Sequence, residues 1–262
     1  MEESLGPRGL LGEDSRGLAS APLEHLLGQG AHRAGKHQDG RDERVHAKHV
    51  GSVEHAARAG RHAGAGSLQR MGDSQPIIVV SGLPRSGTSM AMQMLQAGGI
   101  EVMTDHARVA DADNPRGYLE FERVKRLRTD RGWLDQASGR AVKVIHLLLM
   151  ELPDDRPYRV IFMHRPMAEV IRSQALMLGR SGRAGASLPP ERLAQVFESQ
   201  LAQVRTWLSA RPCFKVLDLQ HAEVVARPLE QAERVRNFLG VPMDARAMAA
   251  AVDPSLHRNR GN

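Results

Sequence analysis

The sequence lacks several features that define whole classes of protein. It has a single cysteine, Cys213, so no disulfide can form within the chain and no thiolate cluster can hold a metal. It contains no run of about 18 apolar residues, the length that a transmembrane helix needs. The N-terminus carries Glu2 and Glu3 and lacks the basic and apolar regions of a secretory signal. These absences predict a cytoplasmic protein without a transmembrane segment.

Aromatic residues are also scarce, at 3% of the chain, and they are unevenly distributed. Residues 1–74 contain none, yet they hold 13 of the 25 glycines and 7 of the 12 histidines without any helical or strand period. A segment with so few large apolar side chains cannot offset the entropy lost on ordering. We therefore expect a low-complexity, disordered tail over 1–74 and one domain over 75–262. Met71 offers an alternative start, so residues 1–70 need not be a working part of the protein.

The chain is basic, with a formal net charge of +6. Basic and acidic residues balance within 1–74, so this charge belongs to 75–262. A basic domain can bind nucleic acid, but this one has few aromatic side chains to stack on bases, and its basic residues are dispersed. We expect a smaller anionic ligand and no nucleic-acid partner. No metal site is expected, and the sequence does not indicate an oligomeric state.

Short β-branched segments alternate with helical ones from Ile77 onward. Strands are predicted over 77–80, 141–145, 158–163 and 214–217. Helices are predicted from Thr88 to the glycine pair at 98–99, from about Met167, and over the amphipathic stretch 228–239, which ends at Gly240. This alternation is typical of an α/β fold with a doubly wound, mainly parallel sheet flanked by helices.

A glycine-bearing loop, GLPRSGTS over 82–89, joins the first predicted strand and helix. Gly82 and Gly87 have the spacing of a P-loop, whose backbone N–H groups turn inward around phosphate oxygens. Thr88 stands where a nucleotide triphosphatase has lysine, so the usual grip on β and γ phosphates is missing. Arg85 supplies a cation inside the loop instead. We infer an anion-binding loop rather than an ATPase; the alternative is an ordinary glycine turn.

This loop resembles the 5′-phosphosulfate loop of sulfotransferases that use 3′-phosphoadenosine 5′-phosphosulfate (PAPS). The matching residues are Pro84, Arg85, Ser86, Gly87, Thr88 and Ser89. A second element of that family places an arginine at a strand end and a serine eight residues later, both on the 3′-phosphate, and Arg165 and Ser173 have this context and spacing. The resemblance covers roughly residue 75 to the C-terminus and is closest to bacterial-type members. It implies a P-loop fold, PAPS as co-substrate and adenosine 3′,5′-bisphosphate (PAP) as product, without a metal.

Arg165 has independent physical support, because a guanidinium at a strand end beside a helix N-terminus can make paired, charge-assisted bonds to a phosphate. The alternative is a surface salt bridge with Glu169, one helical turn further on. The role of Ser173 rests on the resemblance alone. The resemblance also implies Arg260 as a late ligand of the 3′-phosphate, near Arg258; a frayed basic terminus is the alternative.

Sulfuryl transfer needs a base for the acceptor, and the sequence offers two. Family members often carry a lysine and a histidine at the end of the second strand, where Lys143 and His146 stand, although with the spacing K-x-x-H rather than the K-x-H of cytosolic members. Glu120 is the rival base. His146 can equally be a structural histidine and Glu120 a helix N-terminal acid, and the resemblance slightly favours His146. Asp105 and His106 form a further, weaker pair.

Two other segments have simpler interpretations. The stretch 179–190 (GRSGRAGASLPP) is predicted to be a mobile connection, either a lid or a plain loop. Cys213 is interpreted as a small core residue. The expected function is sulfuryl transfer from PAPS to a hydroxyl or amine of a small-molecule, carbohydrate or lipid acceptor. The alternatives are a divergent P-loop small-molecule kinase and a non-catalytic protein that binds PAP-like nucleotides.

Overall fold

The structure, a computed structural model, describes residues 75–105, 107, 110, 114, 116–181 and 188–254. The predicted tail over 1–74, His106, Arg258, Arg260 and the centre of the 179–190 connection lie outside these residues. Within the described ranges, no helix combines the length and the apolar character needed to cross a membrane.

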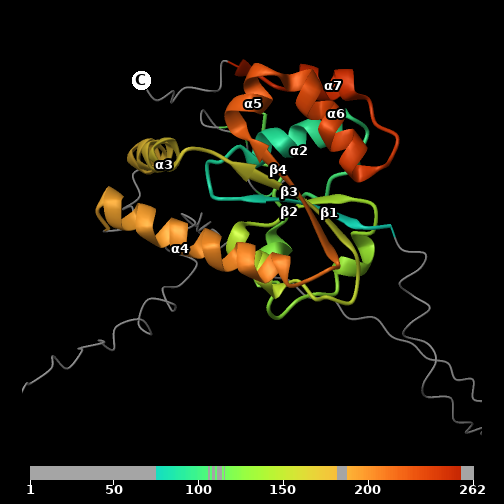
Figure 1. Ribbon diagram of the computed structural model, residues 1–262, viewed down its shortest axis with the longest axis horizontal. Helices are drawn as coiled ribbons and strands as arrows, with labels where there is room; N and C mark the ends of the chain where they lie inside the picture. Colours follow the sequence, from blue (N-terminus) through green and yellow to red (C-terminus); the bar gives the residue numbers. More distant parts are fainter. Residues whose placement is uncertain are drawn as a thin grey trace, which may run out of the picture.

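A parallel four-stranded sheet forms the centre of the molecule, with the strand order β2-β1-β3-β4 (Figure 1). The strands are β1 (Ile77–Gly82), β2 (Ala141–Lys143), β3 (Tyr158–His164) and β4 (Phe214–Gln220). All three neighbouring pairs are parallel, and β3 and β4 pair over their whole length. Helices flank both faces. The predicted α/β class with a doubly wound parallel sheet is confirmed.

The strand ends differ from the prediction because backbone pairing, rather than side-chain hydrophobicity, determines them. The second strand was predicted over 141–145 but ends at Lys143, since the chain turns at Ile145 into a 3₁₀ helix over His146–Glu151. The other three strands run further than predicted. Their added residues include Ser81, which is polar and fully buried but still pairs with its neighbour Phe162.

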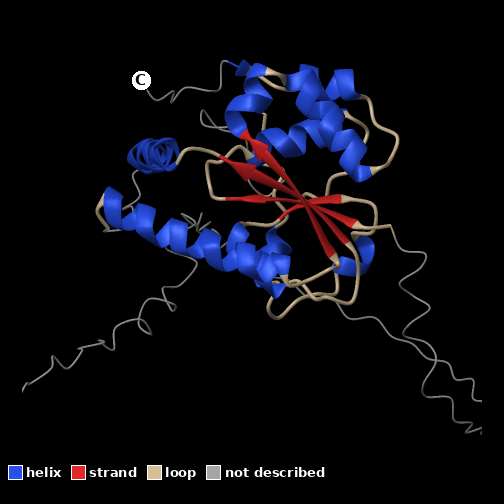
Figure 2. Ribbon diagram, in the orientation of Figure 1, coloured by secondary structure: helices blue, strands red, loops and turns tan. Residues whose placement is uncertain are grey.

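Helices cover the two faces of the sheet as separate layers (Figure 2). One layer contains α2 (Thr88–Ala97), α5 (His221–Ala226), α6 (Pro228–Leu239) and α7 (Ala245–Ala250); α4 (Pro190–Ser209) lies on the opposite face with three short 3₁₀ helices. Successive strand residues point to opposite faces: Ile78 and Val80 join the core beneath α2, whereas Ile77 and Val79 join the core beneath α4. The helix α3 (Met167–Ser181) lies beyond the carboxyl ends of the strands.

Two helix boundaries can be compared with the prediction. The amphipathic helix over 228–239 begins and ends as predicted, and Gly240 follows it in the left-handed region with φ +69°. The predicted connection over 179–190 was too long at both ends, because α3 continues to Ser181 and α4 begins at Pro190. Good helix formers such as Leu176 and Met177 extend α3 past the glycine at 179.

The strand order brings two segments of interest to the same edge of the sheet. β2 pairs with one edge of β1, whereas β3 and then β4 are added on the other edge of β1. The direction in which the chain adds strands therefore reverses between β1 and β3. In open α/β sheets, ligands bind at the carboxyl ends of the strands at such a point. The glycine loop follows β1 and Arg165 follows β3, so both lie there.

Candidate functional site

The loop after β1 has the backbone shape that a phosphate-binding loop requires. Gly82 has φ +145° and Gly87 has φ +102°, and Arg85 between them has φ +69°. A Cβ atom on Gly82 would lie 2.6 Å from the carbonyl oxygen of Met163 and 2.5 Å from Oγ of Ser86, so only glycine fits there. Gly87 is the N-cap of α2, whose first turn carries no acidic residue. The loop therefore presents the N-terminal N–H groups of α2 to an anion.

The hydroxyl of Ser86 is the most unusual group in the loop. Ser86 is 1% exposed, and its Oγ atom makes no hydrogen bond within the described residues. Buried polar atoms normally have a partner. An unsatisfied hydroxyl inside this glycine loop, beside the N-terminus of α2, is suited to an anion oxygen. The neighbouring Pro84 and Thr88 are half-buried in the same loop.

Arg165 directs its guanidinium group into this loop. Nη1 donates to the carbonyl oxygen of Arg85 over 3.2 Å, and Nε donates to Oε2 of Glu169 over 2.9 Å. The salt bridge between Arg165 and Glu169 that the sequence suggested as an alternative is therefore formed. It uses only the Nε atom of the guanidinium group. The side chain is only 8% exposed, and Nη2 is buried with no partner among the described residues. A buried cationic N–H group without an acceptor is costly, and an anion would satisfy it.

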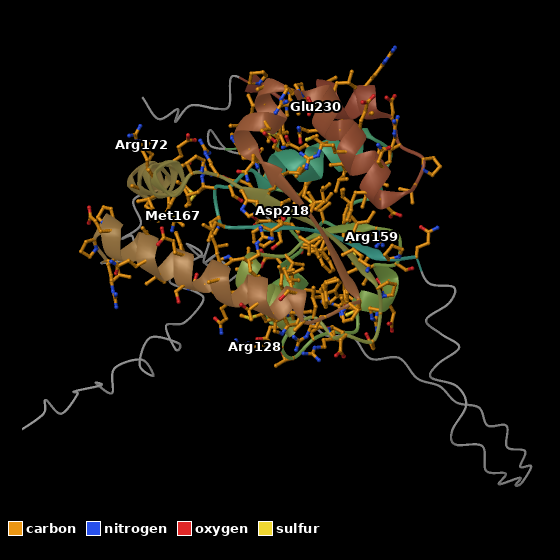
Figure 3. The ribbon with its side chains drawn as sticks, viewed as in Figure 1. Arg128, Arg159, Met167, Arg172, Asp218 and Glu230 are labelled. Atoms are coloured by element: carbon orange, nitrogen blue, oxygen red, sulfur yellow. The ribbon has the colours of Figure 1, made fainter. Side chains whose placement is uncertain are left out.

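Ser173 lies two turns along α3, next to the side chain of Arg85. Arg85 donates from Nε to Oγ of Ser173 over 3.0 Å, and Ser173 is 3% exposed. Arg165 and Ser173 therefore both contact Arg85, one through its backbone and the other through its side chain. Figure 3 marks α3 by its labelled residues Met167 and Arg172. The structure thus brings together three of the predicted binding residues.

Lys143 connects the loop to a carboxylate. Its Nζ donates to Oγ of Ser89 over 3.0 Å and to the carbonyl oxygen of Tyr118, and it lies 3.7 Å from Oε1 of Glu120. The Lys143 side chain is 7% exposed and that of Glu120 is 25% exposed. Lys143 points to the α2 face of the sheet because it stands two residues after Ala141, which also faces α2.

The backbone around Glu120 is held in an unusual conformation. Leu119 has φ +49°, a left-handed value that is uncommon for a leucine. The carbonyl oxygen of Glu120 accepts hydrogen bonds from Oγ1 of Thr104 over 3.0 Å and from the backbone N–H of Asp105 over 3.3 Å. Gln93 on α2 holds the preceding turn through the carbonyl oxygen of Gly117. Strained backbone held from several elements often occurs at functional sites.

His146 lies beneath α4, and its ring also interacts with the backbone of Gly82 at the start of the phosphate loop. It is 2% exposed, its ring lies edge-on to Phe197, and its Nε2 atom is 2.9 Å from Oε1 of Gln200. Burial lowers the pKa of His146, against the opposing effect of the hydrogen bond with Gln200. No hydrogen bond or ion pair within the described part of the chain joins His146 to Lys143 or Glu120. The lysine that the sequence paired with His146 contacts Glu120 instead.

A polar cluster that sequence reasoning missed lies at the ends of β3 and β4. Asp218, labelled in Figure 3, lies 2.7 Å from Nε2 of His164, and both of its oxygens accept hydrogen bonds from Arg205 on α4. Burial alone would raise the pKa of Asp218, but the hydrogen bonds from His164 and Arg205 outweigh it and lower the pKa to about 2. The available signals were a carboxylate between two leucines of a strand and a histidine directly before Arg165. The cluster joins α4 to the edge strand.

The remaining candidates have local structural roles. Asp105 accepts hydrogen bonds from the backbone N–H groups of Ala107 and Glu122, so its carboxylate stabilises a turn. Cys213 packs against the core beneath α4, and burial raises the pKa of its thiol. Its placement accords with the small core residue expected from the sequence.

The chain is similar to several solved structures at low sequence identity. No family model and no curated protein matches the chain. A sulfotransferase domain from the curacin biosynthetic pathway is 15% identical, with a TM-score of 0.41 over 70% of this chain and 89% of that one. A sulfotransferase from Mycobacterium tuberculosis is 13% identical, with a TM-score of 0.45 over 70% and 72%. A sugar kinase from Janibacter is 15% identical, with a TM-score of 0.35 over 70% and 98%.

Proposed function

We propose that the protein transfers a sulfuryl group from PAPS to a hydroxyl or amine acceptor. The observation that carries this proposal is a pair of buried donors without partners among the described residues, Nη2 of Arg165 and Oγ of Ser86, at the carboxyl edge of the sheet. They lie on two adjacent loops, so they suit a ligand with two anionic groups. PAPS has anionic groups at both its 5′ and 3′ positions.

The loop after β1 would hold the 5′-phosphosulfate. The hydroxyl of Ser86 is buried in this loop without a partner among the described residues, and the N-terminus of α2 adds partial positive charge. Lys143 brings an ammonium group to the same place through its hydrogen bond to Ser89. Arg165 and Ser173 would bind the 3′-phosphate. Arg260 lies outside the described residues, and its contribution to the 3′-phosphate stays a prediction.

The reaction is an in-line displacement at sulfur. The acceptor oxygen or nitrogen attacks the sulfur of PAPS, a bond from sulfur to the acceptor forms, and the bond from sulfur to the 5′-phosphate oxygen breaks. The acceptor proton passes to a base, and PAP leaves with the electron pair of the broken bond. Lys143 and the loop N–H groups stabilise the negative charge that develops on the leaving phosphate.

Glu120 is the base that the geometry supports better. Its carboxylate is partly exposed and lies beside Lys143, which contacts the phosphate loop through Ser89. A substrate bound at the mouth of the loop could therefore reach it. His146 is buried between the end of β2 and α4, with Nε2 engaged by Gln200. We assign the proton transfer to Glu120 and a packing role to His146.

The proposal is tested by incubating the purified protein with PAPS labelled in sulfur and an extract of the source cell. A labelled product, absent when Glu120→Gln replaces the wild-type protein, is the expected result, and identifying that product defines the acceptor. The same extract with ATP labelled in the γ-phosphate and magnesium tests the kinase alternative. Labelled product from ATP, with none from PAPS, would refute sulfuryl transfer.

A further inference from the structure

We infer that Arg85 binds the 3′-phosphate of the donor and that it makes the site selective for 3′-phosphorylated nucleotides. This inference rests on the proposed function and deepens it. From the sequence, the position of Arg85 within the loop places it at the 5′-phosphosulfate. The side chain takes a different direction in the structure.

The backbone conformation of Arg85 explains this direction. With φ +69°, Arg85 is the only non-glycine residue of the described phosphate loop in the left-handed region. Its side chain runs to α3, where Nε bonds to Oγ of Ser173 and Nη1 lies 4.0 Å from Sδ of Met177. Ser173 and Met177 stand one helical turn apart. The guanidinium group is therefore aligned along one face of α3.

Arg165 holds Arg85 in this place from the other side. Its Nη1 donates to the carbonyl oxygen of Arg85, which fixes the strained peptide, while its Nη2 is buried without a partner among the described residues. The guanidinium groups of Arg85 and Arg165 and the hydroxyl of Ser173 are thus connected by hydrogen bonds into one set. Turning the Arg85 side chain toward the proposed 5′-phosphosulfate position would break its hydrogen bond to Ser173.

Charge also favours a phosphate monoester as the ligand of this set. A phosphate monoester carries nearly two negative charges at neutral pH and has three strong acceptor oxygens. Guanidinium groups bind such oxygens through paired hydrogen bonds, which adds geometric selectivity to the attraction. One of the two arginines, Arg165, is already paired with Glu169. A second guanidinium matches the second negative charge of the monoester.

The experiment compares two nucleotides that differ only at the 3′ position. Isothermal titration calorimetry measures the affinities of PAP and of adenosine 5′-monophosphate for the wild-type protein, Arg85→Ala and Arg85→Gln. Loss of a charged hydrogen-bond partner should lower PAP affinity by about 10- to 100-fold. The affinity for the 5′-monophosphate should change by less than about 3-fold, well below that loss.

Arg172→Ala is the matched control, because Arg172 is an exposed arginine on α3 next to Ser173 and points away from the body of the molecule (Figure 3). It should leave both affinities unchanged. The thermal unfolding midpoint of each variant shows whether it folds, and Arg85→Gln keeps a polar side chain of similar length if Arg85→Ala does not.

Three results would overturn the inference. If Arg85→Ala loses affinity equally for PAP and for the 5′-monophosphate, Arg85 binds the 5′-phosphate group. If it loses affinity for neither, Arg85 does not bind the nucleotide. Both results are compatible with the proposed function. A wild-type protein that does not bind PAP would overturn the inference together with the proposed function.

Discussion

Glu120 and Lys143 face each other beside the phosphate loop, with Oε1 of the carboxylate 3.7 Å from Nζ of the ammonium group. The same ammonium group bonds to Ser89, the last residue of the loop motif. One buried cation therefore joins the proposed base to the proposed donor site. Because Lys143 is almost completely buried, its attraction to both neighbours is less screened than it would be at the surface.

The first prediction separates the two candidate bases. Glu120→Gln keeps the shape of the side chain but cannot accept a proton, so turnover should fall by about 10²- to 10⁴-fold. PAP affinity should stay nearly unchanged, because the base binds the acceptor and not the nucleotide. The measurement is the initial rate of sulfuryl transfer to the acceptor found by labelling.

His146→Gln is the matched variant for this comparison, since a glutamine can still bond to Gln200. It should retain nearly wild-type turnover. If His146→Gln instead loses turnover while Glu120→Gln does not, the roles assigned to the two residues are reversed.

A second prediction concerns Gly82. A methyl group there would lie within 2.6 Å of the carbonyl oxygen of Met163, so Gly82→Ala must displace the loop from β3. We expect a lower unfolding temperature and a loss of PAP binding beyond detection. Gly99→Ala is the control, because Gly99 also has a positive φ (+95°) but has no atom within 4 Å of its added Cβ.

Gly99→Ala should lower the free energy of unfolding by about 1–2 kcal/mol because of backbone strain alone, and it should keep its PAP affinity. Thermal unfolding and nucleotide titration of both variants provide the comparison. Unimpaired PAP binding by Gly82→Ala would show that the close approach to β3 does not shape the binding loop.

The third prediction is a pH dependence caused by His146. Burial lowers its pKa below the ordinary value of 6.5, so the unfolded chain binds a proton more readily than the folded protein. The contribution to stability is present above pH 6.5 and is lost as the pH falls below it. Urea unfolding at a series of pH values should therefore show a decrease in the free energy of unfolding below about pH 6.5. The decrease should be smaller in His146→Gln, and equal slopes for the two proteins would exclude His146 as the cause.

The fourth prediction concerns Asp218, whose pKa is lowered from 3.8 to about 2. Because the folded value lies below the unfolded one, its contribution to stability is present above about pH 4 and is lost as the pH falls toward 2. The side chain is 43% exposed, so solvent screening reduces the contribution to roughly 1 kcal/mol. The difference in unfolding temperature between wild type and Asp218→Asn should shrink over this range. A difference that is independent of pH would assign the effect to packing.

The fold could be predicted from the sequence where residue type and backbone structure agree. The run Ile77–Val80 is β-branched and buried on both faces, and it begins β1, an inner strand of the sheet. Gly82 and Gly87 have positive φ values, as their spacing in the loop suggested. The 3₁₀ turn at His146 was not predicted, because Val144 and Ile145 look like a continuing strand. The 3₁₀ helix that begins at His146 contacts Phe197 and Gln200 of α4, residues far away in the sequence.

For the candidate site, the sequence indicated which residues lie near one another better than which of them form hydrogen bonds or ion pairs. Arg165, Ser173 and the loop residues were identified from their motif spacing, and the structure brings them together. The direction of Arg85 was not predictable, since it depends on a left-handed backbone at a residue other than glycine. The partner of Lys143 was not predictable either, because Glu120 is 23 residues away and reaches it through a loop held by Gln93 and Thr104.

The most direct test of the proposed function is a calorimetric titration of the full chain with PAP in the absence of magnesium, compared with ATP in its presence. Saturable binding of PAP is the predicted result, and Arg165→Ala should weaken it by about 2–5 kcal/mol because a buried guanidinium–phosphate pair is lost. Saturable binding of ATP with magnesium, without detectable binding of PAP, would contradict a PAPS-dependent sulfotransferase.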